Sequence, residues 1–203
     1  MQLTALQIDI LQELMNIGVG RAASMLNRMV SKHIRLHVPE VRVLSTVELL
    51  AMYSEQGDPA FASVTLTFEG VFSGRGALVF PPDSAAKLVS IIIGQDASSM
   101  DMDSFRIGTL QEVGNIVLNG VIGSIANILG HHLTYSPLDY FEGRLRSLVM
   151  MGDDPSHFVL LARAKFDIAP LPIIGDIIIL FHLGTFTKLL NALELLATSA
   201  TRG

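Results

Sequence analysis

The frame LQExxNI occurs twice in this chain, at residues 11–17 and again at residues 110–116, 99 positions later. A second repeat accompanies it, because the segment that starts at Phe72 resembles the segment that starts at Ile173. Three landmarks recur in the same order: Gly74 and Gly175, Phe80 and Phe181, Lys87 and Lys188. Self-similarity of this kind indicates an internal duplication, which constrains the fold more than any single motif does.

Each half is expected to contain a long helix, a pair of short strands, a short helix, a hairpin of two longer strands and a closing helix. In the first half we expect these elements near residues 4–30, 33–46, 47–53, 61–81 and 83–93. In the second half we expect them near residues 104–129, 131–138, 141–150, 157–180 and 184–198. The small, polar segment 94–104 is expected to join the halves.

We therefore predict one α/β domain over residues 1–203, built of two homologous halves, 1–98 and 99–203. The expected architecture has pseudo-twofold symmetry and a mixed sheet shared by both halves, because neither half has enough strands to cover its own helices. Two long helices are expected to pack on that sheet.

The composition favours a large core and excludes several classes of function. Half of the residues are hydrophobic, 16% are charged, and the mean hydropathy is +0.48. The absence of cysteine removes disulfides and thiolate metal sites and fits a reducing compartment, so we expect a cytoplasmic protein. The net charge of −5, with no run of Lys or Arg, argues against nucleic-acid binding.

The stretch Val113–Leu138 contains no charged residue and is long enough to span a bilayer. It also contains three asparagines, two histidines and four glycines, which is too polar for a spanning helix. A helix buried in a protein core explains the same apolarity, so no membrane segment is expected. The N-terminal residues lack the basic and apolar regions of a signal peptide.

Both predicted long helices carry one narrow stripe of polar and small residues on an otherwise apolar surface. The first stripe contains Asp9, Glu13, Asn16, Gly20, Ser24 and Asn27, and the second contains Gly108, Glu112, Asn115, Asn119, Gly123 and Asn127. A solvated helix face is the ordinary explanation for either stripe alone. The recurrence of Glu and Asn three residues apart favours a functional site, because a solvated face requires only polarity.

Glu and Asn also form a chemically useful pair. A carboxamide donates and accepts hydrogen bonds without titrating, so it can hold a water molecule in line with an electrophile. A carboxylate beside it can bind a cation or accept a proton. Positioning of this kind is most of what hydrolysis of a phosphoryl group requires.

The spacing Asp9-x3-Glu13-x2-Asn16-x22-Pro39 resembles the signature of the CheC, CheX and FliY family of chemotaxis phosphatases. The duplicated layout extends this resemblance over the whole chain and is most similar to the CheC type. The resemblance implies a phosphatase that docks on the phosphorylated response regulator CheY and accelerates loss of phosphate from its aspartate. It implies no cofactor bound by this chain, since the Mg²⁺ belongs to the regulator.

Carried over through the resemblance, Asn16 and Asn115 would orient the attacking water, and Glu13 and Glu112 would pair with a lysine of the regulator. Pro39 is expected to shape the turn after the first strand. The resemblance also implies a possible second partner, the receptor deamidase CheD, at the short helix near residues 141–150. No motif in that segment is specific enough to assign this partner.

The second site departs from the signature in two ways. Gly108 stands where the signature has Asp or Ser, and Pro137 follows after twenty-one residues instead of twenty-two. In the first site, Met15 stands where the second site has Gly114, and Arg21 occupies a position where many relatives have a second Asn. These differences leave the ranking of the two sites open.

Two other patterns suggest different chemistry and are set aside. Residues 18–23 satisfy the dinucleotide fingerprint G-x-G-x-x-A with Glu40 downstream, but that fingerprint needs a strand before its glycines, and the preceding residues have helical periodicity. The histidine pairs 33/37 and 131/132 have no third ligand nearby, so no metal site is expected.

The alternative to catalysis is a docking module that binds a receiver domain or a deamidase and regulates by occupancy.

Overall fold

The computed structural model describes residues 3–30, 33–93, 102–150, 157–168 and 171–200. The first half contains α1 (Ala5–Met29), β1 (Ile34–Ser45), α2 (Thr46–Ser54), β2 (Ala60–Gly70), β3 (Gly74–Phe80) and α3 (Pro82–Ile93). The second half contains α4 (Met102–Ile128), β4 (Leu133–Tyr135), β5 (Asp139–Arg144), α5 (Leu145–Val149), β6 (His157–Ile168), β7 (Leu171–His182) and α6 (Leu183–Ala200). The expected order of elements is thus confirmed, except that the first half has one strand, β1, where a pair of short strands was expected.

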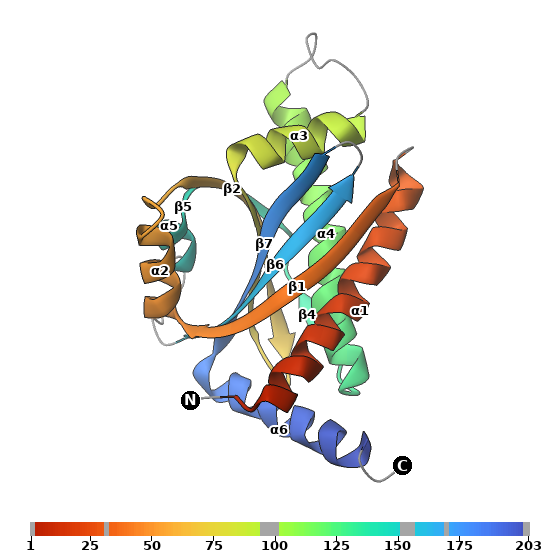
Figure 1. The fold of residues 1–203 in the computed structure, drawn as a ribbon, viewed down its shortest axis with the longest axis vertical. Coiled ribbons are helices and arrows are strands. Elements are labelled where there is room, and N and C mark those ends of the chain that lie inside the picture. Colours follow the sequence, from red (N-terminus) through yellow and green to blue (C-terminus); the bar gives the residue numbers. More distant parts are fainter. Residues whose placement is uncertain (1–2, 31–32, 94–101, 151–156, 169–170, 201–203) are drawn as a thin grey trace.

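The strands form one seven-stranded antiparallel sheet in the order β1-β6-β7-β3-β2-β4, with β5 also paired to β2 (Figure 1). This arrangement confirms the predicted α/β fold with a sheet shared by the two halves, although the described strand pairs are all antiparallel where a mixed sheet was expected. The outer strands are exchanged. The first-half strand β1 pairs with β6 of the second half, and the second-half strands β4 and β5 pair with β2 of the first half.

The two hairpins meet at the centre of the sheet, where β3 pairs with β7. Ala77 lies opposite Ile178, and these residues are 101 positions apart, as are the landmarks Gly74 and Gly175. Counterpart residues therefore face each other in the middle of the sheet. This register supports our proposal that the halves are homologous and related by a twofold axis through this point.

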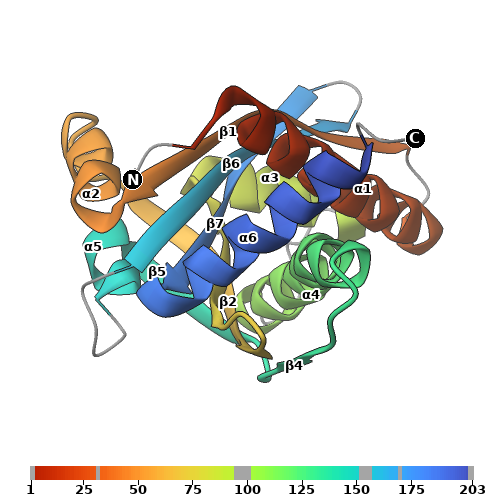
Figure 2. The same ribbon diagram turned by 90° about the horizontal axis from the view of Figure 1, so that it is seen from below.

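Helices cover both faces of the sheet (Figure 2). Helices α1 and α4 pack on one face, with α3 and α6 at their ends, and these elements enclose the larger hydrophobic core. Helices α2 and α5 lie side by side on the other face over a smaller core. The central strand β3 serves both, because Leu78 and Phe80 belong to the larger core and Ala77 and Val79 to the smaller one.

Helix α1 begins at a capping box, in which the Thr4 hydroxyl accepts from the Gln7 backbone N–H and the Gln7 side chain accepts from the Thr4 N–H. The same device starts α2 with Ser45 and Glu48. Hydrogen bonds donated by the backbone and side chain of Ser45 lower the pKa of Glu48. Such boxes satisfy N–H groups that the helix itself leaves unpaired.

Helices α1 and α4 run in opposite directions (Figure 1) and cross where Gly18 meets Gly120. A Cβ atom added at Gly18 would lie 2.5 Å from the Cα of Val121 and 2.9 Å from the carbonyl oxygen of Gly120. Gly18 therefore permits close helix packing. It lies in the middle of α1 rather than after a strand, which removes the context that a dinucleotide fingerprint requires.

The prediction of paired short strands was wrong for the first half. Residues 34–45 form one strand, β1, which continues through a bulge between His37 and Glu40. Pro39 therefore lies in this bulge and not in a turn after the strand. Bulges accommodate proline because local ladder pairing is already interrupted there.

In the second half the chain does divide at the corresponding point, but the predicted boundaries were misplaced. Strand β4 covers only 133–135, and β5 covers 139–144, where we had expected the short helix to begin. Ser136 explains the division, because its N–H donates to the Thr67 carbonyl and its hydroxyl accepts from the Thr67 N–H. The short helix α5 follows at 145–149.

Helix α4 contains most of the uncharged stretch that raised the question of a membrane. Its apolar side chains, among them Val113, Leu118 and Val121, are fully buried inside the protein. Over the described part of the chain, none of the helices combines the length and the apolarity needed to cross a bilayer. Burial in the core accounts for the composition of this stretch, as predicted.

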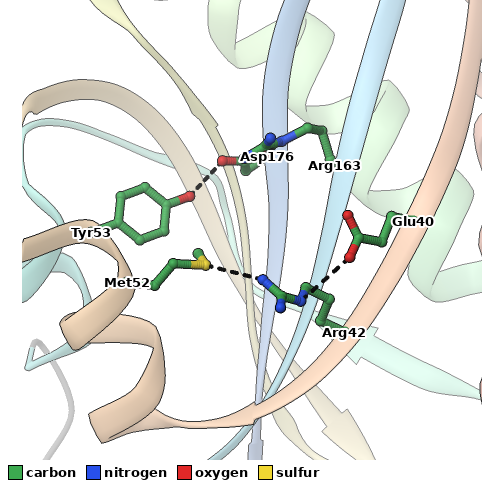
Figure 3. A network of polar contacts seen from close by, with 6 residues as sticks. All are labelled: Glu40, Arg42, Met52, Tyr53, Arg163 and Asp176. Atoms are coloured by element: carbon green, nitrogen blue, oxygen red, sulfur yellow. Dashed lines mark hydrogen bonds and ion pairs between the residues drawn. The ribbon is translucent and has the colours of Figure 1, made fainter. Parts of the chain in front are cut away.

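A polar network ties α2 to the sheet (Figure 3). The hydroxyl of Tyr53 donates to Asp176 Oδ2 at 2.5 Å, and Arg163 Nε donates to Asp176 Oδ1 at 3.2 Å. Beside them, Arg42 Nε lies 3.4 Å from Glu40 Oε1. Each charge in the network has an opposite charge close by, and the network anchors α2 on the sheet.

Candidate functional site

The four residues singled out by the repeated frame lie on the two long helices. Glu13 and Asn16 are on α1, and Glu112 and Asn115 are on α4. Both glutamates are exposed, and both asparagines are half-buried. Because the helices are antiparallel and cross at Gly18 and Gly120, a rise of 1.5 Å per residue puts Glu13 and Glu112 roughly 20 Å apart along the helix axes. We call the α1 pair site one and the α4 pair site two.

The amide of Asn16 is bonded to the backbone of β1 in both directions. Its Nδ2 donates to the Val38 carbonyl at 3.2 Å, and the Val38 N–H donates to its Oδ1 at 2.9 Å. Asn27 bonds to both backbone groups of Ile34 in the same way. Gln12 Nε2 adds a bond to the Pro39 carbonyl at 3.1 Å. Site one thus uses its amide to fasten α1 along the outer side of β1.

Site two lacks this attachment. Asn115 Oδ1 accepts a hydrogen bond from Asn119 Nδ2 at 2.5 Å instead of one from a strand. The counterpart of Val38, 99 positions on, is Pro137, which has no N–H to donate. The counterpart of Asn27 is Ala126, which has no amide. Among the described residues, the two pairs of bonds that Asn16 and Asn27 make to β1 therefore have no counterparts on α4.

A polar cavity of about 440 Å³ occupies the space left between α4 and β4. Its lining includes Asn115, Asn119, Asn127, His131, Tyr135 and Ser136. Burial raises the pKa of Tyr135, which keeps its hydroxyl neutral. Asn119 Oδ1 is buried and has no hydrogen-bond partner within the described residues. The Asn115 amide therefore borders an open polar space.

A second hollow, also of about 440 Å³, adjoins Glu112 where α1, α3 and α4 meet. Its lining is mostly apolar and includes Met29, Ile92, Phe105, Gly108 and Glu112. We call it the apolar hollow. Site two therefore has an exposed carboxylate with an apolar hollow on one side and an amide facing a polar cavity further along the helix.

The remaining signature positions are distributed as follows. Asp9 and Gly108 are exposed counterparts, so site one carries one carboxylate more than site two. Arg21 donates to the Ser124 hydroxyl at 3.2 Å and thereby bridges α1 and α4. Among the described residues, no cluster of three His, Asp or Glu side chains could hold a metal ion.

The sequence reasoning missed the hydrogen bonds of three residues that shape the sites. Gln12 donates to the Pro39 carbonyl of β1, and Gln111 donates to the Leu138 carbonyl, between β4 and β5. Their shared place in the repeated frame was the available signal. Asn119 was recognised as part of a polar stripe, but its bond to Asn115 could not be inferred, because its counterpart Gly20 has no side chain.

Comparison with known proteins agrees with this architecture. The model of the CheC-like family matches residues 6–43. The chain is 30% identical over 169 residues to the CheY-P phosphatase CheC of Bacillus subtilis. The aligned region covers 79% of this chain and 80% of that protein. The chain belongs to the CheC-like family.

Solved structures share the fold. The crystal structure of FliY from Thermotoga maritima matches with a TM-score of 0.75 at 18% identity, covering 96% of this chain and 98% of that one. A CheX–CheY–BeF3–Mg²⁺ complex from Borrelia burgdorferi matches with a TM-score of 0.54 at 16% identity, covering 84% of this chain and 99% of that one. At these identities the likeness concerns the fold.

Proposed function

We propose that this protein is a phosphatase that accelerates hydrolysis of the aspartyl phosphate of a CheY-type response regulator. The observation that carries the proposal is the Glu-x2-Asn pair, present with an exposed Glu on both α1 and α4 in a chain 30% identical to a CheY-P phosphatase. We further propose that the protein acts in the cytoplasm, where this substrate functions.

In the proposed reaction, water attacks phosphorus and the bond between phosphorus and the aspartate oxygen breaks, which releases inorganic phosphate and a carboxylate. The Asn side chain would hold the water in line, because its amide both donates and accepts. The exposed Glu would bind the ammonium group of a receiver lysine. The receiver supplies the Mg²⁺ that balances the phosphoryl charge, so this chain needs no metal of its own.

We propose that site two is the faster site. Within the described residues the Asn115 amide bonds to Asn119 and not to a strand, whereas Asn16 must break two bonds to Val38 before its amide can hold a water. Breaking bonds to a backbone that then stays unpaired carries a penalty of about 1–3 kcal/mol. The additional carboxylate of Asp9 also disfavours approach of a phosphorylated, acidic pocket to site one.

The engagement of Asn16 favours a second role for site one. A helix face with an exposed Glu13 and an Asn16 that is bonded to β1 can bind a receiver without hydrolysing its phosphate. This is the docking function that we considered as the alternative. We propose that site one mainly docks the receiver and contributes little hydrolysis, whereas site two both docks it and hydrolyses its phosphate. Binding of a CheD deamidase stays a hypothesis that rests on the family resemblance.

The test is phosphate release from phosphorylated CheY with wild type, Asn16→Ala, Asn115→Ala and the double variant. We expect Asn115→Ala to remove most of the acceleration and Asn16→Ala to remove little. The double variant should still bind the receiver through Glu13 and Glu112 but should leave only the receiver's own rate. A double variant with the wild-type rate would show that the catalytic assignment is wrong.

Asn27→Ala is the matched control for stability. Like Asn16→Ala, it removes a pair of bonds between α1 and β1, but Asn27 has no proposed catalytic role. Both variants should therefore lower the free energy of unfolding by about 1–3 kcal/mol. If Asn27→Ala lowers the rate as much as Asn115→Ala does, the loss reflects structure and not catalysis.

A further inference from the structure

The apolar hollow beside Glu112 exposes large apolar side chains from two helices. Phe105 is 49% exposed and Met29 is 43% exposed, and both line the hollow. Scattered apolar residues are common on protein surfaces, but a group that lines a hollow marks an interaction site. The aromatic ring of Phe105 is the kind of side chain that anchors protein interfaces.

The hollow lies within reach of anything docked on Glu112. Phe105 precedes Glu112 by seven residues on α4, which is about 10 Å along the helix. A standard interface buries about 800 Å² on each partner, and a disc of that area has a radius of about 16 Å. A receiver centred on Glu112 and Asn115 therefore covers the hollow as part of the same contact.

Site one offers a more acidic surface without an aromatic side chain at the counterpart positions. Phe105 corresponds to Leu6, Gly108 to the acidic Asp9, and Met29 to Ile128, each 99 positions apart. Gly108 leaves open space beside Phe105, since a Cβ atom added there would meet nothing within 4 Å. Only at site two, within the described residues, do these positions combine an aromatic side chain with a missing carboxylate.

We propose that the apolar hollow binds an apolar side chain on the rim of the receiver's phosphoryl pocket and makes site two the higher-affinity docking site. This inference rests on the proposed function and names the contact that selects the substrate. Burial of an apolar side chain in the hollow contributes affinity. Glu112 positions the receiver along α4 by pairing with the receiver's lysine, and Asn115 contributes catalysis. Affinity and turnover therefore depend on different residues of one helix.

The test uses CheY from the same genome, held in its phosphorylated form by beryllofluoride and Mg²⁺, and measures its dissociation constant by titration calorimetry. Phe105→Ala should weaken binding about tenfold, as expected for truncation of an interface anchor. Met29→Ser, on the opposite wall of the hollow, should weaken binding in the same direction. Leu6→Ala, the matched control at site one, should change the constant less than about twofold.

Steady-state kinetics with phosphorylated CheY provide the second readout. Phe105→Ala should raise KM by about the same factor and leave kcat unchanged, because Glu112 and Asn115 remain. Equal binding by wild type, Phe105→Ala and Met29→Ser would overturn the inference. So would a fall in thermal stability of both variants without a change in binding, since the hollow would then serve packing.

The two proposals fail differently. If wild type binds the activated receiver but does not hydrolyse its phosphate, the proposed function is wrong, and the calorimetric comparison still decides the role of the hollow. If wild type hydrolyses the phosphate and Phe105→Ala matches it in KM and in the dissociation constant, the role of the hollow is wrong and the proposed function stands.

Discussion

At the scale of single residues, the hydroxyl of Tyr53 shows how this protein stabilises the partly buried carboxylate of Asp176. Tyr53 is 3% exposed, and its hydroxyl donates to Asp176, which also accepts from Arg163 (Figure 3). Burial raises the pKa of Tyr53 well above its ordinary value, and the negative charge of Asp176 raises it further. The folded protein therefore keeps this phenol neutral at a pH at which an unfolded chain would ionise it.

This raised pKa predicts a loss of stability in alkali. The folded state holds the Tyr53 proton more tightly than the unfolded state, so the stabilisation is complete below about pH 10 and is lost as the pH rises above it. The loss is about 1.4 kcal/mol for each pH unit. Tyr53→Phe lacks the proton, so its stability should fall less steeply than that of wild type between pH 10 and 11.

The measurement is the free energy of urea unfolding at pH 7 to 11 for both proteins. At pH 7 we expect the variant to be less stable by about 1.5–3 kcal/mol, because it loses a hydrogen bond to a charged group. The difference should shrink above pH 10. A difference that stays constant up to pH 11 would contradict the assignment.

At the scale of the elements, the sequence predicted types and order well and details of pairing poorly. The long helices followed from apolar periodicity, and the Glu and Asn positions from the repeated frame. The bond between Asn16 and Val38 was beyond sequence reasoning, because it depends on how a helix lies beside a strand 22 residues further on. For the same reason, the sequence shows that Pro137 departs from the signature spacing, but it does not show that Asn115 thereby loses a backbone N–H partner.

The strand boundaries failed for a related reason. Pro39 and Pro137 mark nearly the same place in the two halves, yet β1 continues through a bulge while β4 and β5 are separate strands. The difference depends on the neighbour across the sheet, because β1 has β6 along most of its length and Ser136 binds Thr67. Local propensity does not contain this information.

The helix crossing allows a direct test with two glycines of the same helix. Gly18→Ala should lower the free energy of unfolding by about 1–3 kcal/mol, because the new methyl group would meet the α4 backbone and force α1 and α4 apart. Gly20→Ala meets nothing within 4 Å and should stabilise the protein by about 0.5–1 kcal/mol through better helix propensity.

Chemical denaturation of the two alanine variants and wild type checks this prediction. Opposite signs are the informative result, since both substitutions make the same chemical change two residues apart. Equal effects of the two substitutions would mean that the helices do not pack as closely as the contact at Gly18 and Gly120 indicates.

At the scale of the whole molecule, the exchange of outer strands joins the two halves. Strand β1 has its pairing partner in the second half, and β4 and β5 have theirs in the first. Neither 1–98 nor 99–203 can form its own complete sheet. We therefore expect the proposed duplication to give one cooperative unit rather than two independent domains.

This arrangement predicts complementation between separated halves. Residues 1–98 or 99–203 expressed alone should show no cooperative thermal unfolding by circular dichroism, because each lacks partners for an outer strand and half of the larger core. An equimolar mixture should recover a single transition. A half that unfolds cooperatively as a monomer near the melting temperature of the full chain would contradict the shared sheet.

The amides of α1 that bond to the outer side of β1 have a consequence for the solubility of the protein. A strand at the border of a sheet presents free N–H and C=O groups that can recruit a strand from another molecule and start aggregation. Asn16, Asn27 and Gln12 occupy such groups on Ile34, Val38 and Pro39. Side chains usually considered for chemistry thereby also protect this border from uncontrolled polymerisation.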